Sequence, residues 1–344
     1  MAGRQNYPRR ALLLWLVFIF LTQTALAQSI WMDKSVDKVI WLEVQKPDYT
    51  KEYLGEDFYD SRQTTLATSV LFLSGQWRVS KPFAFRAEIP FASWGYKDYS
   101  RVFFITTYDY PTGTLDTLHF SGFSETGFGN PLAAVQLGGG TFPLLGEIGV
   151  RFPLARTEPA ARLAETKLGG SYSNQALTAS RTIDYDRLEA FLEDFWSFTA
   201  AAEYQFSGPS GAILRLRAAP VWTVSLNERA RYEMLNNPFD NEVYADYSFQ
   251  VGYQSTRLLL LTGVTSRSLL TAGENDLGEK TISHWGFAAS YSIGHFIPGF
   301  HFRLPLDEQL SRDLDFVFGF HVGYALPGFS KILQRKPKEP ELDV

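Results

Sequence analysis

In several segments of this chain, charged side chains lie two residues apart. Arg86 and Glu88 are two residues apart, as are Arg215 and Arg217. Side chains at i and i+2 point to the same side of an extended strand, so this spacing predicts polar surfaces of mixed sign. Such surfaces could line a lumen and select solutes by charge. The candidate lumen-lining residues are Arg86, Glu88, Glu147, Arg151, Glu203, Arg215, Arg217, Asp246, Gln250, His284 and His321.

Residues for catalysis are scarce. The sequence holds five histidines, of which His295 and His301 are expected around a turn between strands. Ser283 adjoins His284, but neighbours on a strand point to opposite faces and cannot form a nucleophile–base pair. No metal-binding spacing and no phosphate-binding glycine loop is present, and the absence of cysteine excludes thiolate chemistry. We therefore expect no enzyme activity, no metal and no cofactor.

The elements that must position the polar residues are β-strands. In Val243–Tyr253 (VYADYSFQVGY), apolar residues alternate with Asp246, Ser248 and Gln250, which indicates a strand with one polar face. Six further segments alternate in the same way: Phe83–Phe91, Leu144–Phe152, Phe195–Phe206, Ala212–Val224, Thr281–Ile293 and Leu314–Tyr324. Five less regular segments bring the expected total to about twelve: Val36–Gln45, Thr64–Arg78, Asn130–Gly140, Arg257–Leu270 and Gly299–Leu304.

One turn predicts a specific register. The stretch SGPSG separates Phe206 from Ala212 and holds the residue types that form turns. If it is a five-residue loop, Glu203 lies directly across from Arg215 on the same face.

The connections alternate in length. Long segments such as Lys46–Gln63, Gly95–Gly129 and Leu154–Asp194 alternate with short ones such as Val79–Pro82 and Thr141–Pro143. This alternation is typical of an antiparallel transmembrane β-barrel with short periplasmic turns and long external loops. A soluble β-sandwich is the alternative fold.

The barrel prediction assigns a surrounding to each face and a possible role to one loop. Tyr247 and Phe249 would face lipid, while Asp246 and Gln250 would face the lumen. The loop Leu154–Asp194, with a short helix around Pro159–Leu168, could be a gate or a solvated external loop.

The ends of the chain predict a compartment. Residues 1–27 combine arginines, an apolar run and Ala25-Leu26-Ala27, which is the pattern of a signal peptide cleaved before Gln28. Residues 28–330 would form an outer-membrane barrel, and residues 331–344 a disordered periplasmic tail. The net charge of −5 gives no reason to expect nucleic acid, and the aromatic fraction of 15% is typical of a barrel with interfacial girdles.

One part of the chain resembles a known family. Glu125–Leu137 (ETGFGNPLAAVQL), followed by Leu144–Leu154 (LLGEIGVRFPL), resembles outer-membrane β-barrels of the "MetA pathway of phenol degradation" type. Gly127-Phe128-Gly129-Asn130 stands at a Gly-x-Gly-Asp motif of that group, and Phe152-Pro153-Leu154 at its Pro-Thr-Gly motif. The resemblance implies a transporter-like barrel for hydrophobic compounds. From the residues alone, we interpret the two glycines and Asn130-Pro131 as a device that starts a strand.

These observations predict passive passage of a small, hydrophobic or amphipathic molecule through an outer-membrane barrel. The alternative function is a non-transporting barrel that anchors or binds through its external loops. An open charged bore would favour transport, whereas mixed-sign charges that pair inside the barrel would form a plug. The expected partners are the outer-membrane bilayer, a small solute and the barrel-assembly machinery, for which Tyr324 or Phe329 would be the signal.

Overall fold

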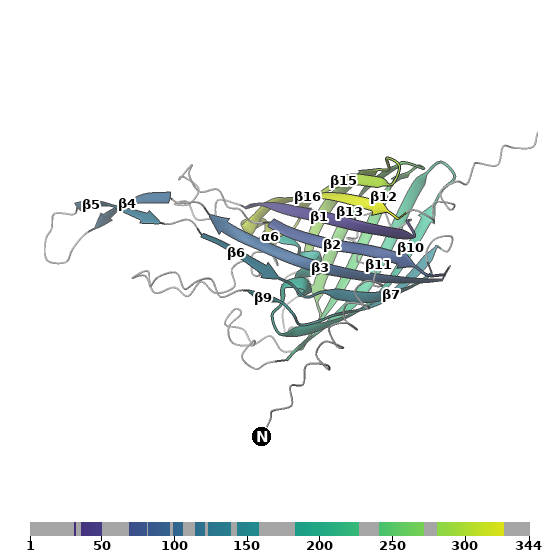
Figure 1. Ribbon diagram of the computed structural model, residues 1–344, viewed down its shortest axis with the longest axis horizontal. Helices are drawn as coiled ribbons and strands as arrows, with labels where there is room; N and C mark the ends of the chain where they lie inside the picture. Colours follow the sequence, from purple (N-terminus) through teal and green to yellow (C-terminus); the bar gives the residue numbers. More distant parts are fainter. Residues whose placement is uncertain are drawn as a thin grey trace, which may run out of the picture.

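The computed structural model of this chain is a closed β-barrel of twelve antiparallel strands, which confirms the predicted fold (Figure 1). The structure describes residues 31, 36–49, 69–80, 82–96, 99–105, 114–120, 123–138, 143–157, 183–226, 241–271 and 281–326. The predicted signal peptide, the helix expected around Pro159–Leu168 and the predicted tail at 331–344 lie outside these residues. None of the helices among the described residues is long and apolar enough to cross a membrane.

Each barrel strand pairs with its neighbours in the chain. The strands are β1 (Lys38–Tyr49), β2 (Ser69–Arg78), β3 (Phe83–Tyr96), β7 (Leu132–Gly138), β8 (Leu144–Arg151), β10 (Phe195–Ser207), β11 (Ala212–Ser225), β12 (Glu242–Gln254), β13 (Leu258–Leu269), β14 (Thr281–Tyr291), β15 (Phe296–Pro305) and β16 (Leu314–Ala325). Pairing of β1 with β16 closes the barrel. We call the end with the short connections, such as 208–211, the turn end, and the opposite end the loop end.

The segment Gly95–Gly129, which the sequence predicts to be a long connection between strands, contains further strands. The prediction that it only connects two strands is therefore wrong. β3 continues beyond its pairing with β7 and pairs there with β6 (Phe123–Phe128), which in turn pairs with β9 (Arg156–Thr157). β4 (Tyr99–Ile105) and β5 (Thr114–Phe120) form a separate two-stranded sheet, seen beyond the loop end in Figure 1. A short helix, α6 (Glu308–Asp313), connects β15 to β16.

The two faces of the wall differ in polarity as predicted. Tyr247 and Phe249 of β12 expose 46% and 52% of their surface, whereas Gln250 exposes 1%. The other alternating strands show the same division, with large apolar side chains outside and most charged ones inside. The soluble β-sandwich is excluded, because a sandwich buries the apolar faces of its sheets.

The predicted register of the β10–β11 hairpin is wrong. Glu203 pairs with Arg217, and Arg215 pairs with Gln205. The connection is four residues long (208–211) rather than five, because the last residue of the predicted loop, Gly211, adopts positive φ and Ser207 continues β10. The slip moves the partner by two residues, so Glu203 and both arginines still share the inner face.

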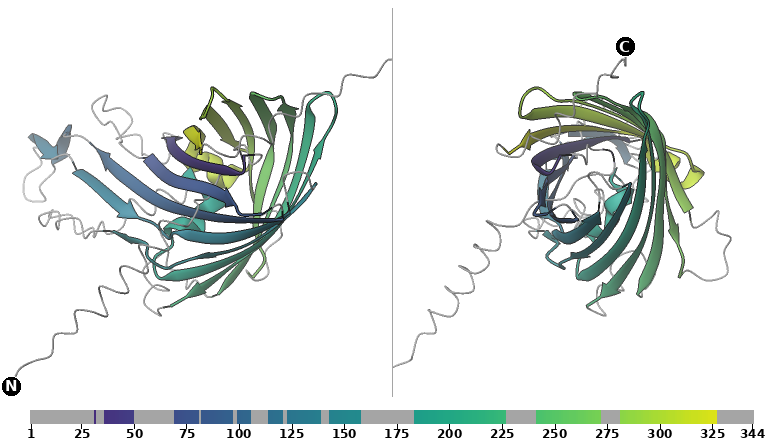
Figure 2. Two further views of the ribbon diagram at one scale, coloured as in Figure 1. Left: turned by 45° about the vertical axis from the view of Figure 1, so that its right-hand side comes forward. Right: turned by 90° about the vertical axis from the view of Figure 1, so that its right-hand side faces the viewer.

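The barrel interior is filled in two layers. Toward the loop end, the 3-10 helix η1 (Tyr185–Phe191) lies inside the ring of strands (Figure 2, right). Toward the turn end, apolar residues cluster on the inner wall, among them Trp31, Leu261 and Trp41. The tertiary fold therefore places two segments from outside the wall, one around η1 and one at Trp31, within the lumen.

Candidate functional site: a plug held by charges

The segment 183–192, which contains η1, forms a plug in the lumen. Its side chains Arg187, Leu188, Glu189, Ala190 and Phe191 are all buried. The segment belongs to the predicted loop Leu154–Asp194, for which a gate and a solvated external loop were both open. The solvated-loop interpretation is wrong for residues 183–192, because they are enclosed by the barrel wall.

Apolar contacts fix the two ends of the plug. Ile183 and Phe191 pack in one cluster with residues of β2, β3 and β16, and the ring of Phe191 meets that of Phe72 edge-on at 5.8 Å. Leu188 and Leu192 pack in a second cluster with Phe195 at the start of β10. Burial of these side chains holds the plug in place where it enters and leaves the lumen.

Arg187 is the centre of the plug. Its guanidinium lies 3.0 Å from the carboxylate of Glu43 and 2.8 Å from that of Glu88, both on the wall. It also donates to Asp184 of the same segment, at 2.8 Å. The guanidinium carbon lies 3.5 Å above the ring of Phe72, a cation–π contact. One plug cation thus links three carboxylates.

Wall arginines hold the acidic residues of the plug. Glu189 lies 2.8 Å from Arg267 and 3.5 Å from Arg151. Arg303 lies 3.2 Å from Asp184 and 3.4 Å from Asp186. These contacts come from three different parts of the barrel wall, so they fix the plug on several sides.

The charges of the plug stabilise one another. Burial by itself would raise the pKa of Asp184, but the guanidinium groups of Arg187 and Arg303 outweigh it and hold the pKa well below its usual range. Burial would lower the pKa of Arg187, but Asp184, Glu43 and Glu88 raise it well above its usual value. Both groups therefore remain charged at neutral pH.

Asn130 clamps the plug to the wall. Its side-chain amide donates to the backbone carbonyls of Glu189 (3.0 Å) and Leu192 (2.6 Å), and its carbonyl accepts from the backbone of Ala155 (2.7 Å). Its own N–H donates to the carbonyl of Ala190, at 2.6 Å. The interpretation of Asn130 as only a strand-start device is therefore incomplete.

The preceding glycine allows this close approach of the plug. A Cβ atom on Gly129 would lie 2.4 Å from the carbonyl oxygen of Ala190. A glycine-asparagine pair is common in turns, so the sequence offered no signal that this one binds a distant segment.

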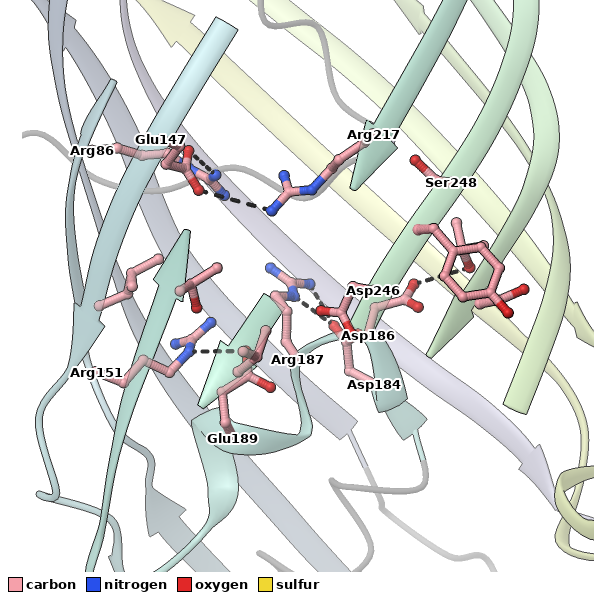
Figure 3. Close-up of a pocket in the computed structure, with 16 residues that line it drawn as sticks. Arg86, Glu147, Arg151, Asp184, Asp186, Arg187, Glu189, Arg217, Asp246 and Ser248 are labelled. Carbon is pink, nitrogen blue, oxygen red and sulfur yellow. Dashed lines mark hydrogen bonds and ion pairs between the residues drawn. The ribbon is translucent and has the colours of Figure 1, made fainter. Parts of the chain in front are cut away.

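A second polar cluster lies on the wall below the plug. Glu147 accepts from Arg86 (2.6 Å) and Gln136 (2.8 Å), with Arg217 at 3.9 Å. Between this cluster and the plug is a cavity of about 70 Å³ (Figure 3). A buried water needs roughly 10–15 Å³ of cavity volume. The cavity therefore has room for a few waters and not for an organic solute.

The structure places all the predicted lumen residues inside the barrel. Glu88, Arg151, Asp246 and His284 lie near the plug, as their contacts with its residues or with the plug-binding Arg267 show. Arg86, Glu147 and Arg217 form the lower cluster, and Arg215 donates to Gln205 at 3.0 Å. Glu203 and Gln250 are buried on the same inner face, and the ring of His321 meets that of Trp41 at 5.3 Å.

Sequence reasoning missed several residues of the site. The wall residues Glu43, Arg267 and Arg303 lie on strands whose alternation is irregular, and the plug residues lie in a segment without periodicity. The placement of His301 at a turn is wrong: it lies within β15, is fully buried, and is 3.6 Å from Glu43. The spacing of residues along the sequence cannot show that strand residues and a loop residue will meet inside a barrel.

One cluster contains groups that hydrolases use. His284 Nδ1 lies 3.1 Å from the hydroxyl of Thr265 and 3.7 Å from the carboxylate of Asp186. A catalytic relay needs the nucleophile on one ring nitrogen and the acid on the other, whereas both groups here face Nδ1. This arrangement therefore gives no support to hydrolysis. Within the described ranges there is no group of three or more acidic, His or Cys residues placed to hold a metal ion.

Comparisons with known proteins show the fold. No protein-family model and no curated protein sequence matches this chain. Among solved structures, it is similar to the COG4313 outer membrane channel from Pseudomonas putida F1, with a TM-score of 0.51 and 10% identity over 87% of this chain and 99% of that chain. It is also similar to LpxR from Salmonella typhimurium (TM-score 0.41, 9% identity, 84% and 100% of the two chains) and to the NanC porin (TM-score 0.41, 8% identity, 83% and 98%). The similarity to the COG4313 channel shows the β-barrel fold of this chain.

Proposed function

We propose that this protein is an outer-membrane channel for a small molecule, and that the segment 183–192 is its gate. The observation that carries the proposal is the way the plug is held: its centre is bound to the wall by ion pairs of Arg187 and Glu189. The apolar outer face supports insertion in a bilayer. The resemblance to phenol-degradation barrels favours a hydrophobic or amphipathic solute.

A polar plug suits a gate for a physical reason. Buried ion pairs are often no more stabilising than apolar residues of the same volume, so barrel stability alone does not require them. When a charged plug leaves, water can solvate both its charges and those of the wall. An apolar plug would instead expose hydrophobic surface in the open state. The network therefore permits a closed state, in which the charges pair with one another, and an open state, in which water solvates them.

Removal of Arg187 is the first test. Arg187→Ala leaves Glu43, Glu88 and Asp184 facing one another without their shared cation, which typically costs about 3–5 kcal/mol for a buried pair. Single-channel recordings of the refolded protein in planar bilayers should show the open:closed ratio rising by at least about ten-fold, equivalent to about 1.4 kcal/mol. Arg257→Ala, which removes an exposed arginine in a short turn, is the matched control.

The ion selectivity of the open channel tests whether ions pass through the lumen. In the Arg187→Ala background, replacing Arg215 and Arg217 together by Glu should shift the selectivity of the open channel toward cations, because both residues lie on the inner face. An Arg187→Ala protein that inserts, shows a heat-dependent shift in gel mobility and yet opens no more often than the wild type would contradict the gate.

A permanently closed barrel that binds or anchors through its external loops is the second candidate function. It is favoured by the completeness of the pairing at the plug, where Arg151, Arg187, Arg267 and Arg303 each contact at least one carboxylate. The same recordings separate the two candidates, because only a gate opens when its ion pairs are weakened.

A further inference from the structure

Trp31 precedes the first barrel strand in the sequence but lies inside the barrel. Only 1% of its surface is exposed. It forms an apolar cluster with Ile213 of β11, Leu259 and Leu261 of β13, and Ala288 of β14. The indole therefore occupies the turn-end half of the lumen, away from the plug at the loop end.

A glycine of the wall allows this ring to lie close to the backbone. A Cβ atom on Gly286 would come within 2.4 Å of two atoms of the Trp31 ring, so the indole rests directly on the backbone of β14. The absence of a side chain at Gly286 therefore makes room for the ring.

The chain is directed inward just before β1. Val36 is buried in a cluster with Val39, Trp41 and Ile297. Its carbonyl accepts a hydrogen bond from the side-chain amide of Gln76, at 3.1 Å. Asp37 then pairs with Arg78 at 2.7 Å, where β1 and β2 meet at the turn end. These contacts hold the stretch that precedes β1 against the inner wall.

We propose that Trp31 is the size-selecting constriction of the channel, at its turn end. The inference rests on the proposed channel function. In the strand order, β13 and β14 lie across the barrel from β3, β7 and β8, which contribute Arg86, Gln136 and Glu147 to the polar cluster below the plug. A solute that passes the opened plug must pass between this cluster and the indole. Trp31 thus sets the width of the passage after the gate.

The test uses a channel whose plug is already open. In the Arg187→Ala background, Trp31→Gly should raise the single-channel conductance roughly two-fold and let larger saccharides enter liposomes, because it removes the ring from the bore. Trp222→Gly is the matched control, since it removes a half-exposed indole from the outer face of β11.

Added indole is a readout that a folding defect cannot imitate. Trp31→Gly leaves an apolar cavity of the shape of an indole, lined by Ile213, Leu259, Leu261 and Ala288. Apolar cavities of this kind bind matching aromatic molecules. Indole should therefore return the conductance of this variant toward that of the protein with Trp31, and should leave the Trp222→Gly protein unchanged.

A second variant keeps the tryptophan and moves it. Gly286→Ala places a Cβ in contact with the ring and should displace it, with an increase in conductance in the same direction as Trp31→Gly. Gly208→Ala, whose Cβ meets nothing closer than 3.6 Å, is its control.

The outcomes separate the two proposals. Arg187→Ala channels whose conductance and size limit are unaffected by Trp31→Gly and Gly286→Ala would overturn the constriction and leave the gated channel standing. Silence of the Arg187→Ala protein and of both double variants would overturn the channel function itself.

Discussion

Asn130 carries an unusual share of the contacts between wall and plug for a single neutral side chain. Both amide hydrogens go to plug carbonyls, its carbonyl accepts from Ala155, and its backbone N–H binds Ala190. The family that this segment resembles has aspartate at this position of its motif. An aspartate could accept from the backbone N–H of Ala155 but could not donate to the two carbonyls. Asparagine is therefore the residue that the plug requires, for a reason of hydrogen-bond donors rather than of size.

We expect Asn130→Asp to be as harmful as Asn130→Ala. Both variants leave the carbonyls of Glu189 and Leu192 buried without this donor, which should cost about 1–3 kcal/mol. Thermal unfolding of the refolded protein, followed together with the open fraction of the channel, measures the loss. Gln254→Glu, a change of amide to carboxylate at the turn end, is the control. Wild-type behaviour of Asn130→Asp would show that the clamp has no energetic role.

At the scale of elements, the site combines regular strands of the barrel wall with one irregular segment, the plug. β1, β3, β8, β13 and β15 each contribute a charged residue that faces the lumen, and the plug brings the matching charges. The wall is held by its continuous hydrogen-bonded pairing, whereas the plug is held by apolar contacts at its ends, by ion pairs and by the hydrogen bonds of Asn130. Breaking the ion pairs should thus release the plug without unfolding the barrel.

The pH dependence of the gate follows from Asp184. Its pKa in the folded protein lies below that of an unfolded chain, which is about 3.9. A depressed carboxyl pKa contributes stability that is complete above the unfolded value and is lost as pH falls through the folded value. The contribution of Asp184 to the closed state should therefore be constant from pH 8 to about pH 5 and fall only in stronger acid.

Asp184→Asn removes this contribution at neutral pH. The variant should open more often than the wild type at pH 7, with a difference that shrinks toward strongly acidic pH. Recordings of both proteins across this range measure the effect. A difference between the two proteins that is absent at pH 7 would contradict the contribution of the Asp184 ion pairs to the docked state.

At the scale of the whole molecule, the barrel is inverted relative to a soluble protein. Its interior holds charged side chains and a small cavity, and its outer face exposes rows of large apolar side chains. Rows of exposed phenylalanine, leucine and tyrosine of this extent are stable only against lipid. We therefore infer that the barrel lies in a membrane, in agreement with the outer-membrane location predicted from the sequence.

The lipid-facing assignment predicts a large effect of charge on the outer face. Phe249→Arg should destabilise the barrel by about 2–4 kcal/mol if Phe249 lies near the middle of the bilayer, and Phe249→Leu should have a small effect. Urea-dependent folding into lipid vesicles measures both. Equal stability of Phe249→Arg and Phe249→Leu would place this face in water.

Alternation along individual strands predicted about twelve strands and the shared face of residues such as Arg86 and Gln250, because period two is a local property of the chain. The alternating lengths of the connections then predicted the barrel. The hairpin register was predicted incorrectly, since a change in a turn shifts every partner. The contents of the loop Gly95–Gly129 and the placement of His301 were also predicted incorrectly. The sequence left a gate in the loop Leu154–Asp194 as one possibility, but the partners of the plug residues and the position of Trp31 could not be predicted. Arg187 and Glu43 are 144 residues apart, and only closure of the barrel creates the interior in which they meet.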